Sequence, residues 1–76
     1  MEIKILGKGC KKCKLLTNHA EEALNTLGLD GTVTKVTDIN AIAEYGVFET
    51  PALVVDGNVK SSGKVLSTKK IVKLLN

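Results

Sequence analysis

The 76-residue sequence contains no arginine and no tryptophan, and its aromatic side chains are limited to Tyr45 and Phe48. Proteins that read nucleic acids usually carry arginine for phosphates and bases, together with aromatic side chains for stacking. The lysines are spread along the chain, and the formal net charge is only +3. The composition therefore disfavours a nucleic-acid-binding protein, and we expect no nucleic acid among the partners.

Long apolar runs are also absent. Residues 1–6, MEIKIL, are too short and too charged for a signal peptide, and no run approaches the roughly 20 residues that span a membrane. Apolar residues nevertheless make up 43% of the chain, proline occurs once, and no repeat or low-complexity tract is present. We therefore expect one folded domain over residues 1–76 that is cytoplasmic, does not contact a membrane and acts as a monomer.

Cysteine is scarce, but its placement is informative. Both cysteines lie in GKGCKKCK, residues 7–14, as Cys10 and Cys13. In the reducing cytosol a close cysteine pair is more often catalytic or metal-binding than a permanent crosslink. A disulfide here would also close a very small loop, and stabilisation by loop closure grows with loop length. The remaining interpretations are a redox dithiol and half of a metal site.

Hydrophobic periodicity predicts seven elements. Alternation predicts strands, spacings of three and four predict helices, and a short unbroken apolar run predicts a central strand. A DGN turn at 56–58 predicts a hairpin. We expect Asp38 and Ser67 to cap helices, and Ile71, Val72, Leu74 and Leu75 to face inward. The expected elements are strands at 2–6, 32–36, 52–55 and 59–62, and helices at 10–27, at 39–45 and after Ser67.

The predicted order is β-α-β-α-β-β-α. This order indicates an α/β fold in which three helices flank a mixed four-stranded sheet as a three-layer sandwich. Pro51 directly precedes the third strand, where it cannot donate a hydrogen bond to the sheet. A proline at the mouth of a central strand needs a special reason.

The cysteine pair falls at the junction between the first strand and the first helix. Backbone N–H groups at a helix start are unpaired, and the helix dipole is positive there. A thiolate at Cys10 is favoured by both effects, so we expect its pKa to lie below the usual value of about 8.5. Lys11, Lys12 and Lys14 add positive charge that the helix dipole disfavours. They either stabilise the Cys10 thiolate or are solvated lysines in a lysine-rich chain.

Three stretches together resemble a known family. They are GCKKC at the strand-to-helix junction, YGVFETPALVVDGNV at residues 45–59, and the terminal amphipathic helix. This combination resembles the thioredoxin superfamily, and more closely its small glutaredoxin-like, redox-active disulfide proteins of bacteria and archaea. The resemblance covers essentially the whole chain and implies a thioredoxin fold and thiol–disulfide exchange.

The resemblance also implies roles for individual residues. Cys10 is the exposed attacking thiol and Cys13 the buried resolving thiol, and the disulfide between them is the only redox group, with no further cofactor. Pro51 is in the cis form beside the dithiol, and this accounts for a proline directly before a strand. Thr50 presents backbone groups to an extended segment of the partner. The implied partners are disulfide-containing proteins and a reductase.

The sequence departs from the family at several places. Gly9 stands where thioredoxins have an aromatic residue, and Lys11 and Lys12 replace Gly-Pro between the cysteines. Lys4 stands where thioredoxins bury an acid that helps to move protons at the second cysteine, which leaves water for that task. The stretch SSGK at 61–64 lacks the acid that glutaredoxins use for glutathione.

A metal- or iron–sulfur-binding module using the same two thiols is the alternative hypothesis. Metallochaperones of similar length also place a CxxC after the first strand, but their fold ends on a strand, whereas this chain ends on a predicted helix. Two thiolates form only half of a structural zinc site, and we expect no metal. His19 is predicted to be a solvated surface residue, and Tyr45 and Phe48 either line a partner groove or pack in the core or against the loop.

Overall fold

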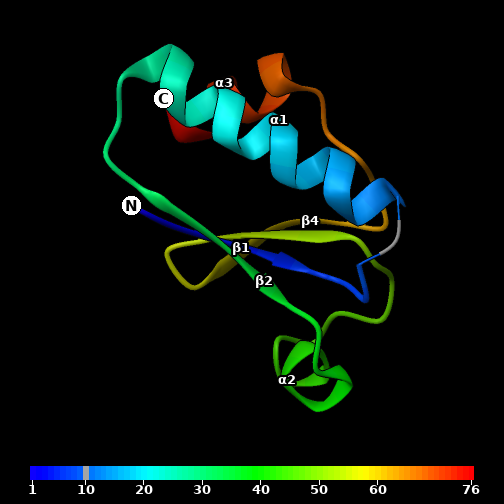
Figure 1. Cartoon of the computed structure of the whole chain (residues 1–76). Helices are drawn as coiled ribbons and strands as arrows, with labels where there is room; N and C mark the ends of the chain where they lie inside the picture. The colour runs from blue at the N-terminus through cyan, green and yellow to red at the C-terminus, as the bar shows by residue number, and fades with distance from the viewer. Residues whose placement is uncertain (10) are drawn as a thin grey trace.

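The computed structural model describes residues 1–9 and 11–76 and contains the seven predicted elements in the predicted order (Figure 1). Helix α2 ends one residue earlier than expected, and β4 begins one residue earlier. Cys10, the predicted first residue of the first helix, lies outside the described residues. The elements are β1 (Glu2–Leu6), α1 (Lys11–Leu27), β2 (Thr32–Val36), α2 (Ile39–Glu44), β3 (Ala52–Val55), β4 (Asn58–Ser62) and α3 (Thr68–Leu75).

The four strands form one mixed sheet in the order β2-β1-β3-β4. Strands β1 and β2 are parallel and are joined through α1, whereas β3 runs antiparallel to both β1 and β4. In the antiparallel register Leu6 faces Ala52. The chain that leaves β1 therefore runs beside the chain that enters β3, and this brings residue 7 close to residues 50 and 51.

Helices cover both faces of the sheet, so the predicted three-layer arrangement is confirmed (Figure 1). Helices α1 and α3 pack on one face, where Ile3, Ile5, Leu16, Leu53 and Ile71 are buried. Helix α2 covers the other face in a smaller cluster of buried residues, comprising Leu6, Ile42, Val47, Ala52 and Val54. Every residue of β3 is buried, as its unbroken apolar run predicts.

Local signals in the sequence explain how the elements begin and end. The Asp38 side chain accepts a hydrogen bond from the Asn40 N–H, and the Ser67 hydroxyl accepts one from the Lys70 N–H, so both predicted caps are confirmed. Asp56 and Gly57 connect β3 to β4 with φ of 48° and 84°. Two consecutive positive φ angles are typical of the hairpin turn that an Asp-Gly pair favours.

One prediction about α3 is wrong. Ile71 is fully buried, and Val72 and Leu75 are partly buried against the same cluster, but Leu74 is 43% exposed. A helix of eight residues resting on one face of a sheet buries a single stripe. Leu74 lies at the edge of that stripe, on the side toward β4.

None of the helices described is long and apolar enough to cross a membrane.

Candidate active site

Cys13 lies in the first turn of α1, on the face of the helix that packs against the sheet. The residue is 4% exposed. The buried Thr17 hydroxyl donates a hydrogen bond to the Cys13 backbone carbonyl, at 2.9 Å. Cys13 is therefore buried in the folded chain, and its role as the resolving thiol stays a prediction. Cys10 lies outside the described residues, and the predicted disulfide between the two cysteines lies outside them as well.

Gly7 is a site residue that the sequence analysis treated only as the end of a strand. It is buried, and its N–H donates to the Val36 carbonyl at 2.9 Å, which extends the pairing of β1 with β2. A methyl group at Gly7 would collide with the Cys13 sulfur and would lie 3.7 Å from the Thr50 Cβ. The missing side chain at Gly7 therefore makes room for the Cys13 thiol. A glycine between a strand and a CxxC motif is the only signal that pointed to it.

Thr50 and Pro51 lie beside this position. The Thr50–Pro51 peptide bond is cis, as the family resemblance predicted. Pro51 is buried, and its carbonyl accepts a hydrogen bond from the Gly63 N–H at 2.9 Å, which ties the loop after β4 to the site. Thr50 is exposed. The fold thus brings the exposed residue Thr50 next to the buried thiol.

Positive charge surrounds the start of α1. Lys11 and Lys12 are its first two residues, both are exposed, and the first turn contains no acid. Among the described residues, Lys4 and Glu2 form the only ion pair within 4 Å. The lysines at the start of α1 therefore have no acidic partner within that distance among those residues. They are available to an anion at the site.

An apolar groove adjoins Thr50 on the α2 side, and we call it the Phe48 groove. It has a volume of about 280 Å³. Phe48 is 92% exposed and Ile39 is 57% exposed, which is unusual for two large apolar side chains close together. The prediction left core packing open for Phe48, and its exposure excludes that role. The groove is lined by Lys8, Ile39, Ile42, Ala43, Val47, Phe48 and Thr50.

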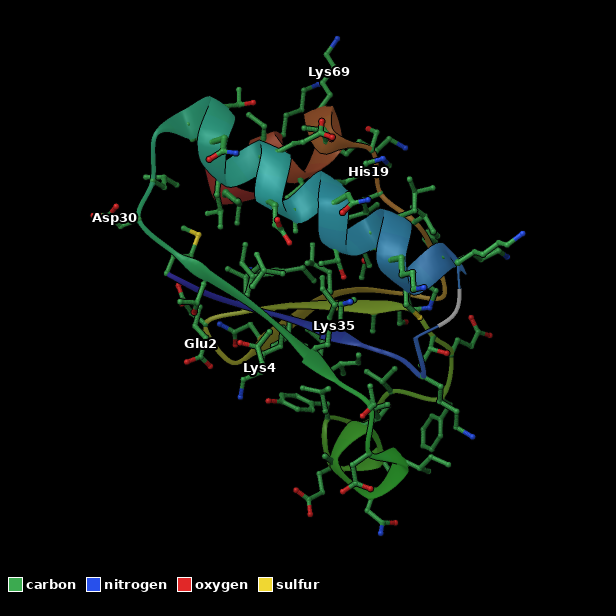
Figure 2. The ribbon with its side chains drawn as sticks, in the orientation of Figure 1. Glu2, Lys4, His19, Asp30, Lys35 and Lys69 are labelled. Carbon is green, nitrogen blue, oxygen red and sulfur yellow. The ribbon has the colours of Figure 1, made fainter. Side chains whose placement is uncertain are left out.

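Lys4 points to the face of the sheet opposite to α1, the helix that carries Cys13 (Figure 2). Its neighbours Ile3 and Ile5 point to the α1 face, whereas the Lys4 ammonium lies 3.2 Å from the Tyr45 hydroxyl next to α2. Hydrogen bonding to Tyr45, and secondarily to Glu2, raises the pKa of Lys4 above its usual value. Lys4 therefore lies on the α2 face of the sheet, whereas Cys13 belongs to α1 on the opposite face.

The prediction that His19 is a solvated surface residue is wrong. It is half-buried on α1 (Figure 2), and its Nδ1 lies 2.8 Å from the Leu66 carbonyl oxygen, so the ring links α1 to the segment before α3.

Among residues 1–9 and 11–76, no three His, Cys, Asp or Glu side chains are grouped so that they could hold a metal ion.

Comparison with known proteins gives concordant matches. A family model described as a thioredoxin domain matches residues 1–76. A protein named thioredoxin from Methanothermobacter thermautotrophicus is 40% identical over 76 residues, which cover 100% of this chain and 99% of that protein. A thioredoxin from Methanocaldococcus jannaschii is 41% identical over 69 residues, covering 91% of this chain and 79% of its own.

Proposed function

Because the chain belongs to the thioredoxin family, we propose that it is a dithiol–disulfide oxidoreductase that exchanges the Cys10/Cys13 pair with disulfides of other proteins. The observation that carries the proposal is the convergence of three segments on one thiol. Cys13 is buried in the first turn of α1, Gly7 leaves room for its sulfur, and the exposed Thr50 adjoins both.

The burial of Cys13 supports the assignment of the two roles. A buried cysteine is poorly placed to meet a disulfide on another protein, and the burial of Cys13 supports Cys10 as the attacking group. The Cys10 thiolate attacks one sulfur of the partner disulfide and releases the other as a thiolate, which takes a proton from water. The Cys13 thiol gives its proton to water, and the resulting thiolate then attacks the Cys10 sulfur and releases the second partner thiolate. Two electrons pass to the partner, and Cys10 and Cys13 become a disulfide.

Two features support the docking of an extended partner segment. Thr50 is exposed beside the Cys13 thiol and next to the buried Pro51, a position suited to strand-like pairing of Thr50 with the partner. The Phe48 groove continues from Thr50 and offers apolar surface to a side chain next to the partner's cysteine. Lys11 and Lys12 add positive charge that favours the Cys10 thiolate and attracts acidic partners.

The proposed cycle needs no cofactor besides the redox-active disulfide. A reductase that donates two electrons must return Cys10 and Cys13 to the dithiol form. We place this cycle in the cytoplasm, where disulfides are kept reduced and a small electron carrier has substrates.

Reduction of insulin disulfides by the protein, with dithiothreitol as electron source, tests the proposal. We expect catalysed precipitation of the insulin B chain, and its loss in Cys10→Ser. Cys13→Ser should instead accumulate a mixed disulfide through Cys10, which mass spectrometry of the trapped partners identifies. Activity that persists in Cys10→Ser would contradict the assignment.

The same preparation tests the metal-binding alternative. Anaerobically purified protein is examined by metal analysis and by its ultraviolet–visible spectrum. Stoichiometric metal, or the absorption of an iron–sulfur cluster, lost in both cysteine variants, would replace the redox proposal with a metal site shared between two copies.

A further inference from the structure

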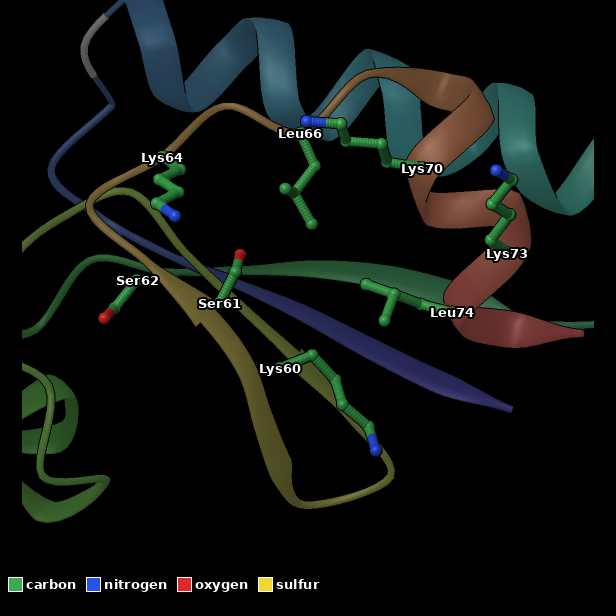
Figure 3. Close-up of a pocket in the computed structure, with 8 residues that line it drawn as sticks. All are labelled: Lys60, Ser61, Ser62, Lys64, Leu66, Lys70, Lys73 and Leu74. Atoms are coloured by element: carbon green, nitrogen blue, oxygen red, sulfur yellow. The ribbon is translucent and has the colours of Figure 1, made fainter.

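A second concave site lies away from the cysteines, between the edge strand β4 and helix α3 (Figure 3). Its volume is about 540 Å³, within the range of small-molecule sites. It contains none of the residues assigned to thiol chemistry. We call it the lysine groove; it is lined by Lys60, Ser61, Ser62, Lys64, Leu66, Lys70, Lys73 and Leu74.

The charge of the lysine groove is entirely positive. Its four lysines come from β4, from the loop after β4 and from α3, and no acidic residue lines it. All four are exposed, and within the described part of the chain none of them forms an ion pair within 4 Å. Lysines that share a groove repel one another, and a bound anion would remove that repulsion.

The groove also has an apolar wall and an unpartnered hydroxyl. Leu66 is partly buried and Leu74 is 43% exposed, so both present apolar surface beside the lysines. Ser61 faces Leu53 in the strand register, and its hydroxyl oxygen is buried without a hydrogen-bond partner among the described residues. Figure 3 shows this hydroxyl turned toward the side that Lys64 and Leu66 line. Buried hydroxyls without a partner are rare in proteins.

We propose that the lysine groove binds a small organic phosphate that carries two phosphate groups. A phosphate ester carries about −1.5 to −2 charge near pH 7, so two such groups balance the four lysines. Lysine binds phosphate as a point charge and needs no planar alignment, which fits a chain without arginine. The organic body of the ligand packs on Leu66 and Leu74, and the Ser61 hydroxyl gains an acceptor.

The test is a titration of the ¹⁵N-labelled protein at low salt with three probes: adenosine diphosphate, inorganic pyrophosphate and adenosine. We expect saturable chemical-shift changes centred on residues 60–66 and 70–74 with adenosine diphosphate, weaker binding of pyrophosphate, and none of adenosine. Equal affinity for adenosine diphosphate and pyrophosphate would contradict the proposed packing of the organic body on the apolar wall. Chemical-shift changes spread over all the lysines would contradict binding at the lysine groove.

Variants separate a built site from general positive charge. The double variant Lys70→Gln/Lys73→Gln should lower the affinity for adenosine diphosphate by roughly tenfold, equivalent to about 1.4 kcal/mol of binding free energy. The matched control is Lys35→Gln/Lys69→Gln, which removes the same charge from exposed positions outside the groove. An equal loss in both double variants would overturn the proposal. Leu74→Ser should lower the affinity for adenosine diphosphate and leave the affinity for pyrophosphate unchanged.

Discussion

The absence of a side chain at Gly7 decides how closely α1 can approach β1. The Cys13 sulfur occupies the space that a Cβ at Gly7 would fill. Protein interiors are close-packed, and an added methyl group must displace what is already there. We therefore expect Gly7→Ala to lower the free energy of unfolding by about 1–3 kcal/mol, measured by urea denaturation, and to change the reaction rate of the Cys13 thiol with a small disulfide in a Cys10→Ser background.

Gly9→Ala is the matched control for Gly7→Ala. Gly9 has a φ of +81°, and apart from its chain neighbours no atom of the described residues lies within 4 Å of a Cβ placed there. This variant should lose roughly 1–2 kcal/mol through backbone strain alone and leave the Cys13 rate unchanged. A Gly7→Ala protein with unchanged stability and an unchanged Cys13 rate would contradict the close approach.

Phe48 is the residue whose exposure most needs a functional reason. At 92% exposed, it contributes little to the folded core, so Phe48→Ser should leave the free energy of unfolding within about 0.5 kcal/mol of the parent. If the Phe48 groove receives a partner side chain, the variant should raise the KM for insulin severalfold. The KM for hydroxyethyl disulfide, which is too small to reach the groove, should not change.

Leu29→Ser controls for the general loss of apolar surface. Leu29 is 40% exposed and follows the end of α1 remote from Cys13. It should change neither KM. An equal effect of Leu29→Ser and Phe48→Ser on insulin would refute the role of the groove.

At the scale of elements, α1 begins with two exposed lysines where a helix favours acids. If this charge stabilises the Cys10 thiolate, Lys11→Gln/Lys12→Gln should raise the pKa of the Cys10 thiol, because removing nearby positive charge disfavours the thiolate. The pH dependence of iodoacetamide labelling at Cys10 measures this change.

Salt provides the control for the α1 prediction. Exposed charges are screened over about 10 Å at 0.1 M ionic strength, so the pKa difference should shrink as salt is added. The variant Lys35→Gln/Lys69→Gln, with the same net charge, should leave the Cys10 pKa unchanged. No difference at low salt between the parent and Lys11→Gln/Lys12→Gln would show that these lysines are only solvated surface.

At the scale of the whole molecule, stability rests on two apolar layers separated by the sheet. The larger layer includes Ile71, which is fully buried, and excludes Leu74. Ile71→Ala should cost about 2–5 kcal/mol, a large part of the 5–15 kcal/mol typical of a domain. Leu74→Ala should cost about 0.5 kcal/mol or less. Urea unfolding midpoints compare the two, and similar losses would mean that α3 packs differently.

The sequence by itself determined the kind and order of the elements. Alternation, helical spacing, the Asp38 and Ser67 caps and the Asp56-Gly57 turn are local signals, and each depends only on residues a few positions apart. The junction that carries Cys10 and Cys13 could be located for the same reason. The cis form of Pro51 was predicted only through the family resemblance, because local propensity favours trans.

Only the tertiary structure decided which distant residues meet. The register of Leu6 with Ala52 places Gly7 between Cys13 and Thr50, and no pattern within either segment specifies that register. The exposure of Phe48 and Leu74 was likewise decided by where the flanking layers end. A hydrophobic pattern states that a side chain prefers burial, but the area of the partner surface determines whether it is buried, and that area depends on how all the elements pack together.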